Sequence, residues 1–367
     1  GPPMRRTVMS PDLPRRSAIP AVRPLMVALA LTVALAGCTG GDPAPQEPTG
    51  PTSPSSLLGA GCSDLVNLTD VRAVLGEAVD VVDDLFSPGG SWPLASVGLI
   101  QAGGLKCEWS DRANQAGDYE ALLEVDVLPN AADEWSEWFT AMSGNYPNES
   151  EDGTTLWSCD SSLGGSYHYC KYDVFAGGNW AAISVSNMAA DADATPIVDT
   201  IAAALTSATS PAAEWSAPPL AGLPATCEEL LPLDTVRTVL GVDDMDVRDA
   251  PLLMPYLHNT GLDGALNCSW VNPFSSALGT PLQVVVLPGA GWAWESSWAI
   301  PRPDFSPAAA VAELGDAAFA GCQPVDNPPC FVDVLVGEAW IALDGRGAAD
   351  ERTLTELAAE ILTNLSN

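Results

Sequence analysis

The sequence predicts an α+β fold with two tandem homologous domains, each a mainly antiparallel sheet packed by helices and stapled by two disulfides. Three observations predict it. Four sequence blocks occur twice in the same order, apolar residues recur at helical or strand-like spacing, and four cysteines stand at matching places in each copy. The chain has 367 residues, of which 47% are hydrophobic, so wholesale disorder is excluded.

The internal repeat defines the domain organisation. Residues 62–76 align without gaps on residues 227–241, with eight of fifteen positions identical. The other blocks are Leu-x-Cys-x-Trp at 105–109 and 266–270, Val-Leu-Pro-x-Ala at 127–131 and 286–290, and Cys-x-x-Asp-Val-x-x-Gly-x-x-Trp-x-Ala at 170–182 and 330–342. We expect domains at 58–208 and 222–367, called here the first and second repeats, joined by a linker at 209–221. Each is long enough to bury its own core.

The two copies predict the same series of elements. Leu68, Val71 and Leu75 lie on one helical face, and a glycine ends the helix in both copies. The expected order is helix, strand, short helix, two strands, helix, three strands, helix. Short connections between the strands indicate an antiparallel sheet. Expected strands are 119–128, 155–161, 167–175 and 179–186, then 282–287, 317–322, 330–336 and 338–344, with helices at 131–143 and 290–300.

Residues 1–37 resemble a secretory signal peptide of the lipoprotein type. Arginines precede a twelve-residue apolar run, 25–36, which is too short to span a bilayer. The run ends Leu35-Ala36-Gly37-Cys38, which looks like a bacterial lipobox in which Cys38 receives a diacylglycerol. The alternative is an ordinary signal peptide with a cysteine nearby by chance. We expect a protein anchored to the cell membrane on its extracytoplasmic face.

Residues 38–57 are predicted to be the lipidated cysteine and a flexible tether. The stretch is rich in Pro, Ser, Thr and Gly and shows no apolar period. Such a coil reaches roughly 25 Å. Two acyl chains are sufficient for stable membrane anchoring.

The charge of the chain excludes nucleic acid as a partner. The formal net charge is −33. Because residues 1–37 hold five arginines and one aspartate, removing them leaves 46 acidic and 9 basic residues, a charge of −37. Phosphate binding needs clustered lysine and arginine.

The remaining eight cysteines predict disulfides, since even numbers in an exported chain indicate a disulfide framework. Sequence alone leaves the connectivity open. We favour Cys159–Cys170 and Cys322–Cys330, because each pair flanks a hairpin-like connection, which leaves Cys62–Cys107 and Cys227–Cys268. The rival is zinc, but four-cysteine zinc sites usually have two close pairs and each copy has only one.

These motifs resemble a known group of proteins. Cys227-Glu-Glu-Leu-Leu231, the apolar helix ending Leu-Gly, and the Cys-x-Trp strand are similar to actinobacterial lipoproteins of uncharacterised function and to the extracytoplasmic sensor domains of mycobacterial serine/threonine kinases. The first repeat departs from the pattern, with Val66 at the second leucine. The resemblance implies an α+β domain, two internal disulfides and a ligand-binding cleft. It implies no catalytic residues.

A search for catalytic motifs predicts no enzyme, cofactor or metal site. The two histidines, His168 and His258, lie at places that do not correspond between the copies. No nucleophile elbow, phosphate loop or His-Glu-x-x-His motif is present. The Asp-rich residues 243–249 lack the Gly and terminal Glu of a calcium loop, so a solvated turn is expected.

The chain has twelve tryptophans, and this is the feature of its composition that suggests ligand binding. Those that recur beside cysteines on strands, such as Trp109 and Trp180, are expected in the core. The helical tryptophans are too dense for one buried stripe, so some are candidates to line a ligand groove, with core packing as the alternative. The ligand-binding candidates are Trp135, Trp138, Trp294, Trp298 and Tyr167.

We therefore expect a non-catalytic ligand-binding or sensor-like module of the cell envelope, with a lipid, glycan or peptide as ligand. The alternative is an adaptor or structural lipoprotein that acts through protein contacts. An envelope hydrolase ranks last.

Overall fold

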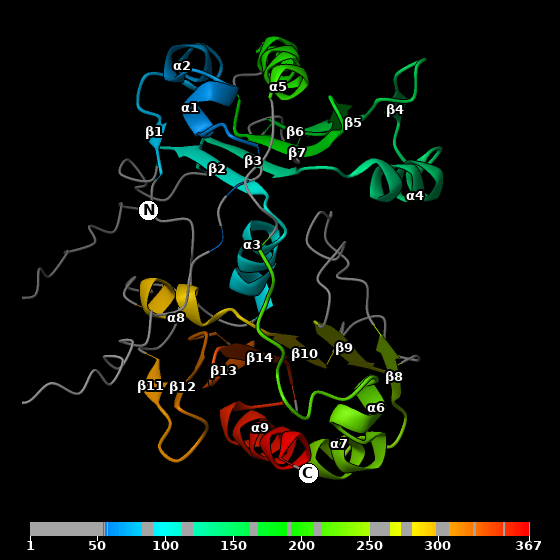
Figure 1. Ribbon diagram of the computed structural model, residues 1–367, viewed down its shortest axis with the longest axis vertical. Helices are drawn as coiled ribbons and strands as arrows, with labels where there is room; N and C mark the ends of the chain where they lie inside the picture. Colours follow the sequence, from blue (N-terminus) through cyan, green and yellow to red (C-terminus); the bar gives the residue numbers. More distant parts are fainter. Residues whose placement is uncertain are drawn as a thin grey trace, which may run out of the picture. The chain divides into compact units, whose positions relative to one another are not determined.

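Two seven-stranded antiparallel sheets, each built from one repeat, form the protein (Figure 1). The computed structural model describes residues 54, 56, 58–82, 91–111, 120–161, 168–188, 192–208, 215–249, 265–272, 281–298, 308–325, 328–347 and 349–366. Helices pack on both sheets, so the predicted α+β class is confirmed. Residues 1–57 lie almost wholly outside the described ranges, and Cys38 is among them.

The first sheet has the strand order β1-β2-β3-β7-β6-β5-β4. The elements of this repeat, in chain order, are α1 (Cys62–Leu65), α2 (Leu68–Leu75), β1 (Asp80–Val81), α3 (Ser91–Gln101), β2 (Leu105–Ser110), β3 (Leu122–Leu128), α4 (Ala132–Met142), β4 (Asn148–Glu149), β5 (Thr155–Ser161), β6 (His168–Ala176), β7 (Asn179–Ser186) and α5 (Thr195–Ser207).

The second sheet has the corresponding order, read from the other edge, β11-β12-β13-β14-β10-β9-β8. Its elements are α6 (Cys227–Leu230), α7 (Leu233–Leu240), β8 (Asp246–Asp249), β9 (Leu266–Val271), β10 (Leu282–Leu287), α8 (Gly291–Trp298), β11 (Ala309–Ala310), β12 (Ala317–Cys322), β13 (Cys330–Val336), β14 (Ala339–Gly345) and α9 (Glu351–Leu365). Most strands and helices start or end within about two residues of the expected ranges.

Two-residue turns close the central hairpin of each sheet. Gly177 and Gly178 join β6 to β7, and both have positive φ, at 60° and 84°. In the second repeat Gly337 takes the same place with φ of 57°. These turns match the twist of antiparallel strands and need a residue that tolerates positive φ, which explains why this glycine recurs in both copies.

The inner face of each sheet carries the larger core. In the first repeat, alternate residues of β3, β6 and β7 pack under α1, α2 and α5, and α6, α7 and α9 cover the corresponding face of the second sheet (Figure 1). Val71 of α2 and Ile201 of α5 are completely buried. The helical spacing recognised in the sequence therefore places its apolar stripe against the sheet.

The outer face of each sheet is buried as well, under a shorter helix rich in tryptophan. Trp180 of β7 packs with Trp135 of α4, and Trp340 of β14 packs with Trp294 of α8. Trp180 is 1% exposed and Trp340 is 0% exposed. The central strands are thus buried on both faces, and the aromatic residues build the second layer.

Helix α3 contributes to the outer layer of both sheets. Its Leu99 belongs to the aromatic cluster of the first repeat, whereas Leu94 and Val97 belong to the cluster around Trp340. The Gln101 Nε2 donates a hydrogen bond of 3.1 Å to the Pro288 carbonyl oxygen. Residues 49–367 accordingly form one compact unit.

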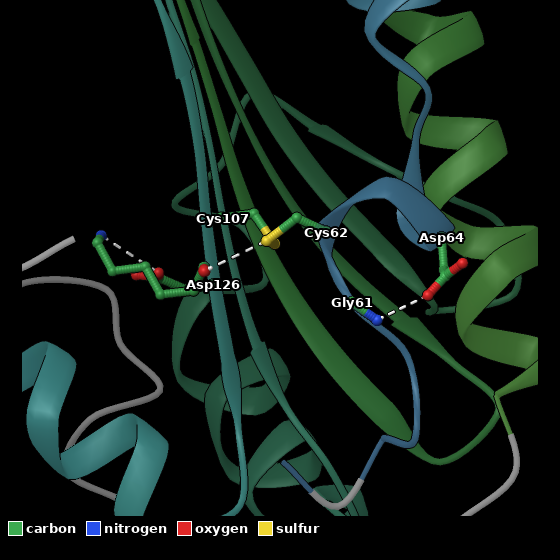
Figure 2. The surroundings of a disulfide bond; sticks show 6 residues. Gly61, Cys62, Asp64, Cys107 and Asp126 are labelled. Atoms are coloured by element: carbon green, nitrogen blue, oxygen red, sulfur yellow. Dashed lines mark hydrogen bonds and ion pairs between the residues drawn. A yellow bond between two sulfur atoms is a disulfide. The ribbon is translucent and has the colours of Figure 1, made fainter. Parts of the chain in front are cut away.

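Four disulfides fasten helices and hairpins to the sheets, in the connectivity that the cysteine spacing favours. They are Cys62–Cys107, Cys159–Cys170, Cys227–Cys268 and Cys322–Cys330. Figure 2 shows Cys62–Cys107 between α1 and the sheet, with Asp126 on the opposite side of the strands. The Asp64 carboxylate accepts a 2.8 Å hydrogen bond from the Gly61 N–H and so fixes the start of α1.

A buried ion cluster lies on the outer face of β2 and β3. The Lys106 ammonium pairs with Glu124 and lies 3.4 Å from the Asp126 carboxylate, although the Lys106 side chain is only 9% exposed. Burial lowers the pKa of Lys106, but the attraction of Asp126 and Glu124 outweighs it and the net shift is upward. In the second repeat the corresponding strands pair two amides, with Gln283 Nε2 donating to Asn267 Oδ1 at 3.2 Å.

We expect the two kinds of disulfide to differ in their effect on stability. Replacing Cys62 and Cys107 by alanine opens a 45-residue loop, and replacing Cys159 and Cys170 opens an 11-residue loop. The chain-entropy relation gives losses of about 4 and about 3 kcal/mol in the free energy of unfolding. Guanidinium unfolding of the two double variants, compared with the parent chain, measures both. A larger loss for the short loop would contradict the entropic account.

Candidate functional site

A pocket of about 260 Å³ opens at the end of the β5–β6 hairpin, beside the Cys159–Cys170 disulfide. The end of β5 contributes Asp160, and the start of β6 contributes His168 and Tyr169. Met188 and residues 192–194, which lie between β7 and α5, line the other side. The pocket therefore draws on three neighbouring segments within residues 159–194.

Strand pairing sets the positions of these side chains. Cys159 is directly opposite Cys170, and Ser161 is opposite His168, so the hairpin is in register up to its end. The Met188 N–H donates a 3.3 Å hydrogen bond to the His168 carbonyl oxygen, which holds the connection against β6. Met188 is 6% exposed and gives the pocket an apolar wall next to the disulfide.

Asp193 is the ionised group at the rim. Its Oδ1 accepts a 2.9 Å hydrogen bond from the Thr195 N–H, so it caps the first turn of α5. Hydrogen bonds from the Thr195 side chain and backbone lower the pKa of Asp193. The carboxylate therefore carries its charge at neutral and mildly acidic pH.

Tyr172 and Tyr169 supply the aromatic part of the lining. Tyr172 is 8% exposed, and burial, with a smaller contribution from the Asp193 charge, raises the pKa of its hydroxyl. The side chain thus stays a neutral phenol that can donate or accept a hydrogen bond. The Lys171 Nζ lies 5.5 Å from the centroid of the Tyr169 ring, within the range of a cation–π interaction.

The tryptophans proposed as a groove in the first repeat lie in the outer aromatic layer. Trp135 is 6% exposed, stacks on Phe175 with centroids 5.8 Å apart and donates from Nε1 to the Gly153 carbonyl oxygen. Trp138 is half-buried, 5.6 Å from the Trp180 ring. Both rings are thus engaged with the protein itself.

The second repeat has the same arrangement. Trp294 is 6% exposed, and its ring lies edge-on to Trp340 with centroids 5.0 Å apart. Trp298 is half-buried and stacks on Phe319 at 4.2 Å. The fifth candidate, Tyr167, lies outside the described residues, although its neighbours His168 and Tyr169 line the pocket.

A buried aspartate recurs under the tryptophans, and the sequence reasoning gave it no role. Asp173 is 2% exposed and accepts hydrogen bonds from the Tyr146 hydroxyl at 2.8 Å and from the Trp180 Nε1 at 3.1 Å. Asp333, its counterpart, is 0% exposed. The signal was present, because the repeated block Cys-x-x-Asp contains this residue in both copies.

Apart from Cys159 and Cys170, the polar and aromatic residues of the pocket lining are not repeated. Gln323 stands where the first repeat has Asp160, immediately after the hairpin cysteine, and Pro328 and Pro329 replace His168 and Tyr169. Asp160, Tyr172, Met188 and Asp193 were missed because no motif joins them.

We expect Trp135 to behave as a core residue. Trp135→Ala removes a buried indole and is predicted to lower the free energy of unfolding by about 3–5 kcal/mol. Glu137→Ala, an exposed change on the same helix, is the control and should shift it by less than about 0.5 kcal/mol. Urea unfolding of the three chains measures this. A Trp135→Ala protein as stable as the control would restore the groove interpretation.

Asp173 predicts a pH dependence of stability. Burial raises the pKa of Asp173 above the ordinary value of 3.8. Hydrogen bonds from Tyr146, Trp180 and Trp138 lower this pKa, but burial has the larger effect. The folded state therefore holds this proton more tightly than the unfolded state, so stability contributed by Asp173 falls as pH rises from 3.8 through the folded pKa. The stability of Asp173→Asn minus that of the parent should rise over this window. Urea unfolding between about pH 3 and pH 8 measures the difference, and a difference that falls with pH contradicts it.

Comparisons with known proteins give no match. No family model, no curated protein and no solved structure matches this chain.

Within the described ranges, no group of three or more His, Cys, Asp or Glu side chains is placed to hold a metal ion. In the same ranges no helix has the length and apolar character needed to cross a bilayer.

Proposed function

We propose that this chain is a membrane-anchored lipoprotein of the cell envelope that acts as a non-catalytic ligand-binding module, with the pocket of the first repeat as its site. The anchor is the diacylglycerol on Cys38 expected from the sequence. The observation that carries the proposal is the convergence of Asp160, His168, Tyr169 and Asp193 on one pocket beside a disulfide.

The composition of the pocket supports binding. Ligand sites typically combine apolar and aromatic walls with a few polar groups that fix orientation. Here Met188 and the disulfide give the apolar contact, and Tyr172 gives a buried phenol. A volume of about 260 Å³ is just below the usual range of ligand sites, about 300–1,000 Å³. It suits one ring or one side chain of a larger envelope molecule better than a lipid acyl chain.

The same pocket does not support hydrolysis. Its two cysteines are joined in a disulfide, so neither is a thiolate nucleophile. The described lining includes no serine or threonine that could serve as a nucleophile.

The adaptor alternative receives no comparable support. A protein-contact surface would be expected to expose a sizeable apolar patch. Among the described residues, Val81 and Val325 are the large hydrophobic side chains that are exposed, at 45% and 56%. They belong to different repeats.

The test is native mass spectrometry of the full lipidated chain purified from its own envelope in neutral detergent. We expect a co-purifying small molecule or envelope fragment on the parent chain and its loss from a variant carrying Asp160→Ala and His168→Ala. Gln323→Ala, at the matching place in the second repeat, is the control and should keep the ligand. A parent chain that is repeatedly free of ligand would contradict the proposal.

A further inference from the structure

Charge and hydrogen bonding at the pocket narrow the class of ligand. Two carboxylates, Asp160 and Asp193, line it, and its described lining includes no lysine or arginine. Hydrogen bonds from Thr195 keep Asp193 ionised. A carboxylate offers only acceptors, so the complementary ligand group is a donor and, in a pocket of this charge, a cation.

The positive end of the neighbouring helix is not open to an anion. The first turn of α5 would attract one through its unpaired N–H groups. The Asp193 carboxylate already accepts the Thr195 N–H at 2.9 Å and occupies that position. The chain as a whole carries −33, which further disfavours a phosphate or carboxylate ligand.

The aromatic lining suits a cation with an apolar body. The Lys171 ammonium lies 5.5 Å from the centroid of the Tyr169 ring, so that ring is already paired with the protein's own cation, and Tyr172 is the aromatic contact left for a ligand. Tyr172 remains a phenol, and Met188 and the Cys159–Cys170 disulfide provide polarisable contact for a ring or short chain.

We propose that the pocket of the first repeat binds a small cationic amine, with the ammonium group between Asp160 and Asp193 and the apolar body against Tyr172 and Met188. This inference rests on the proposed function and names its ligand class. The second repeat does not share this chemistry, because Gln323, Pro328 and Pro329 stand at the corresponding places.

Three probes of equal ring size test the charge preference: benzylamine, benzyl alcohol and benzoate. Each is titrated into the full chain in neutral detergent and followed by saturation-transfer NMR. We expect benzylamine to bind about tenfold or more tightly than benzyl alcohol, the size of one charge-assisted hydrogen bond, and benzoate to show no saturable binding. Equal binding of the three probes, or no binding of benzylamine, overturns the inference.

A variant separates pocket binding from general attraction to an acidic protein. The double variant Asp160→Asn, Asp193→Asn removes only two of the many negative charges of the chain, so general attraction of an amine to the acidic protein is nearly unchanged. The asparagine at position 193 keeps a side-chain oxygen that accepts the Thr195 N–H at the start of α5. Benzylamine affinity should fall about tenfold or more in this variant and stay unchanged in Gln323→Ala. An unchanged affinity in the double variant would place the binding outside the pocket and refute the inference.

Failure of the cationic ligand class can be distinguished from failure of the proposed binding function. A co-purified envelope ligand without a preference for benzylamine would refute the cationic class alone. Absence of both a co-purified ligand and benzylamine binding would refute both proposals.

Discussion

Burial of the central strands on both faces is the constraint on which the rest of the structure depends. A sheet that faces water on one side needs one layer of helices. Here β7 and β14 place Trp180 and Trp340 on the second face, so that face needs a covering layer as well. Among the described residues, the short helices α4 and α8 cover that side together with α3, and bulky rings fill the volume. The same constraint explains Asp173, because a buried indole N–H needs an acceptor and this carboxylate provides one at 3.1 Å.

The elements and the disulfides could be predicted because their signals are local or repeated. The period of apolar residues, the glycine at the hairpin turn and the even cysteine count each describe a short stretch of chain, and the second copy removes ambiguity left by the first. Strand β12, for example, begins and ends at the residues expected, Ala317–Cys322. Pairing Cys322 with Cys330 required only that a hairpin connect them, and they are indeed directly opposite in the sheet.

The site could not be predicted in the same way. Dense tryptophans on a helix are equally typical of a groove and of a second core layer, and only the tertiary position of Trp135 against Trp180 decides between the two. The pocket depends on the meeting of the β5–β6 hairpin end with Met188 and Asp193, which lie beside it because β6 pairs with β7 and not because of any sequence pattern. In the sequence, Lys106 has the character of a surface residue. Its burial follows only from the pairing of its strand with the strand that carries Glu124 and Asp126.

The ion cluster of the first sheet has a consequence for how a duplicated chain folds. Homologous neighbours can exchange strands during folding, since their backbones and apolar patterns are alike. If β2 paired with β10, Lys106 would face Val285 in place of Asp126, and its buried ammonium would lose the Glu124 and Asp126 carboxylates at a cost of several kcal/mol. The amide pair of the second sheet offers no substitute. Divergence at this one cross-strand position therefore disfavours hybrid sheets between copies that otherwise share their topology.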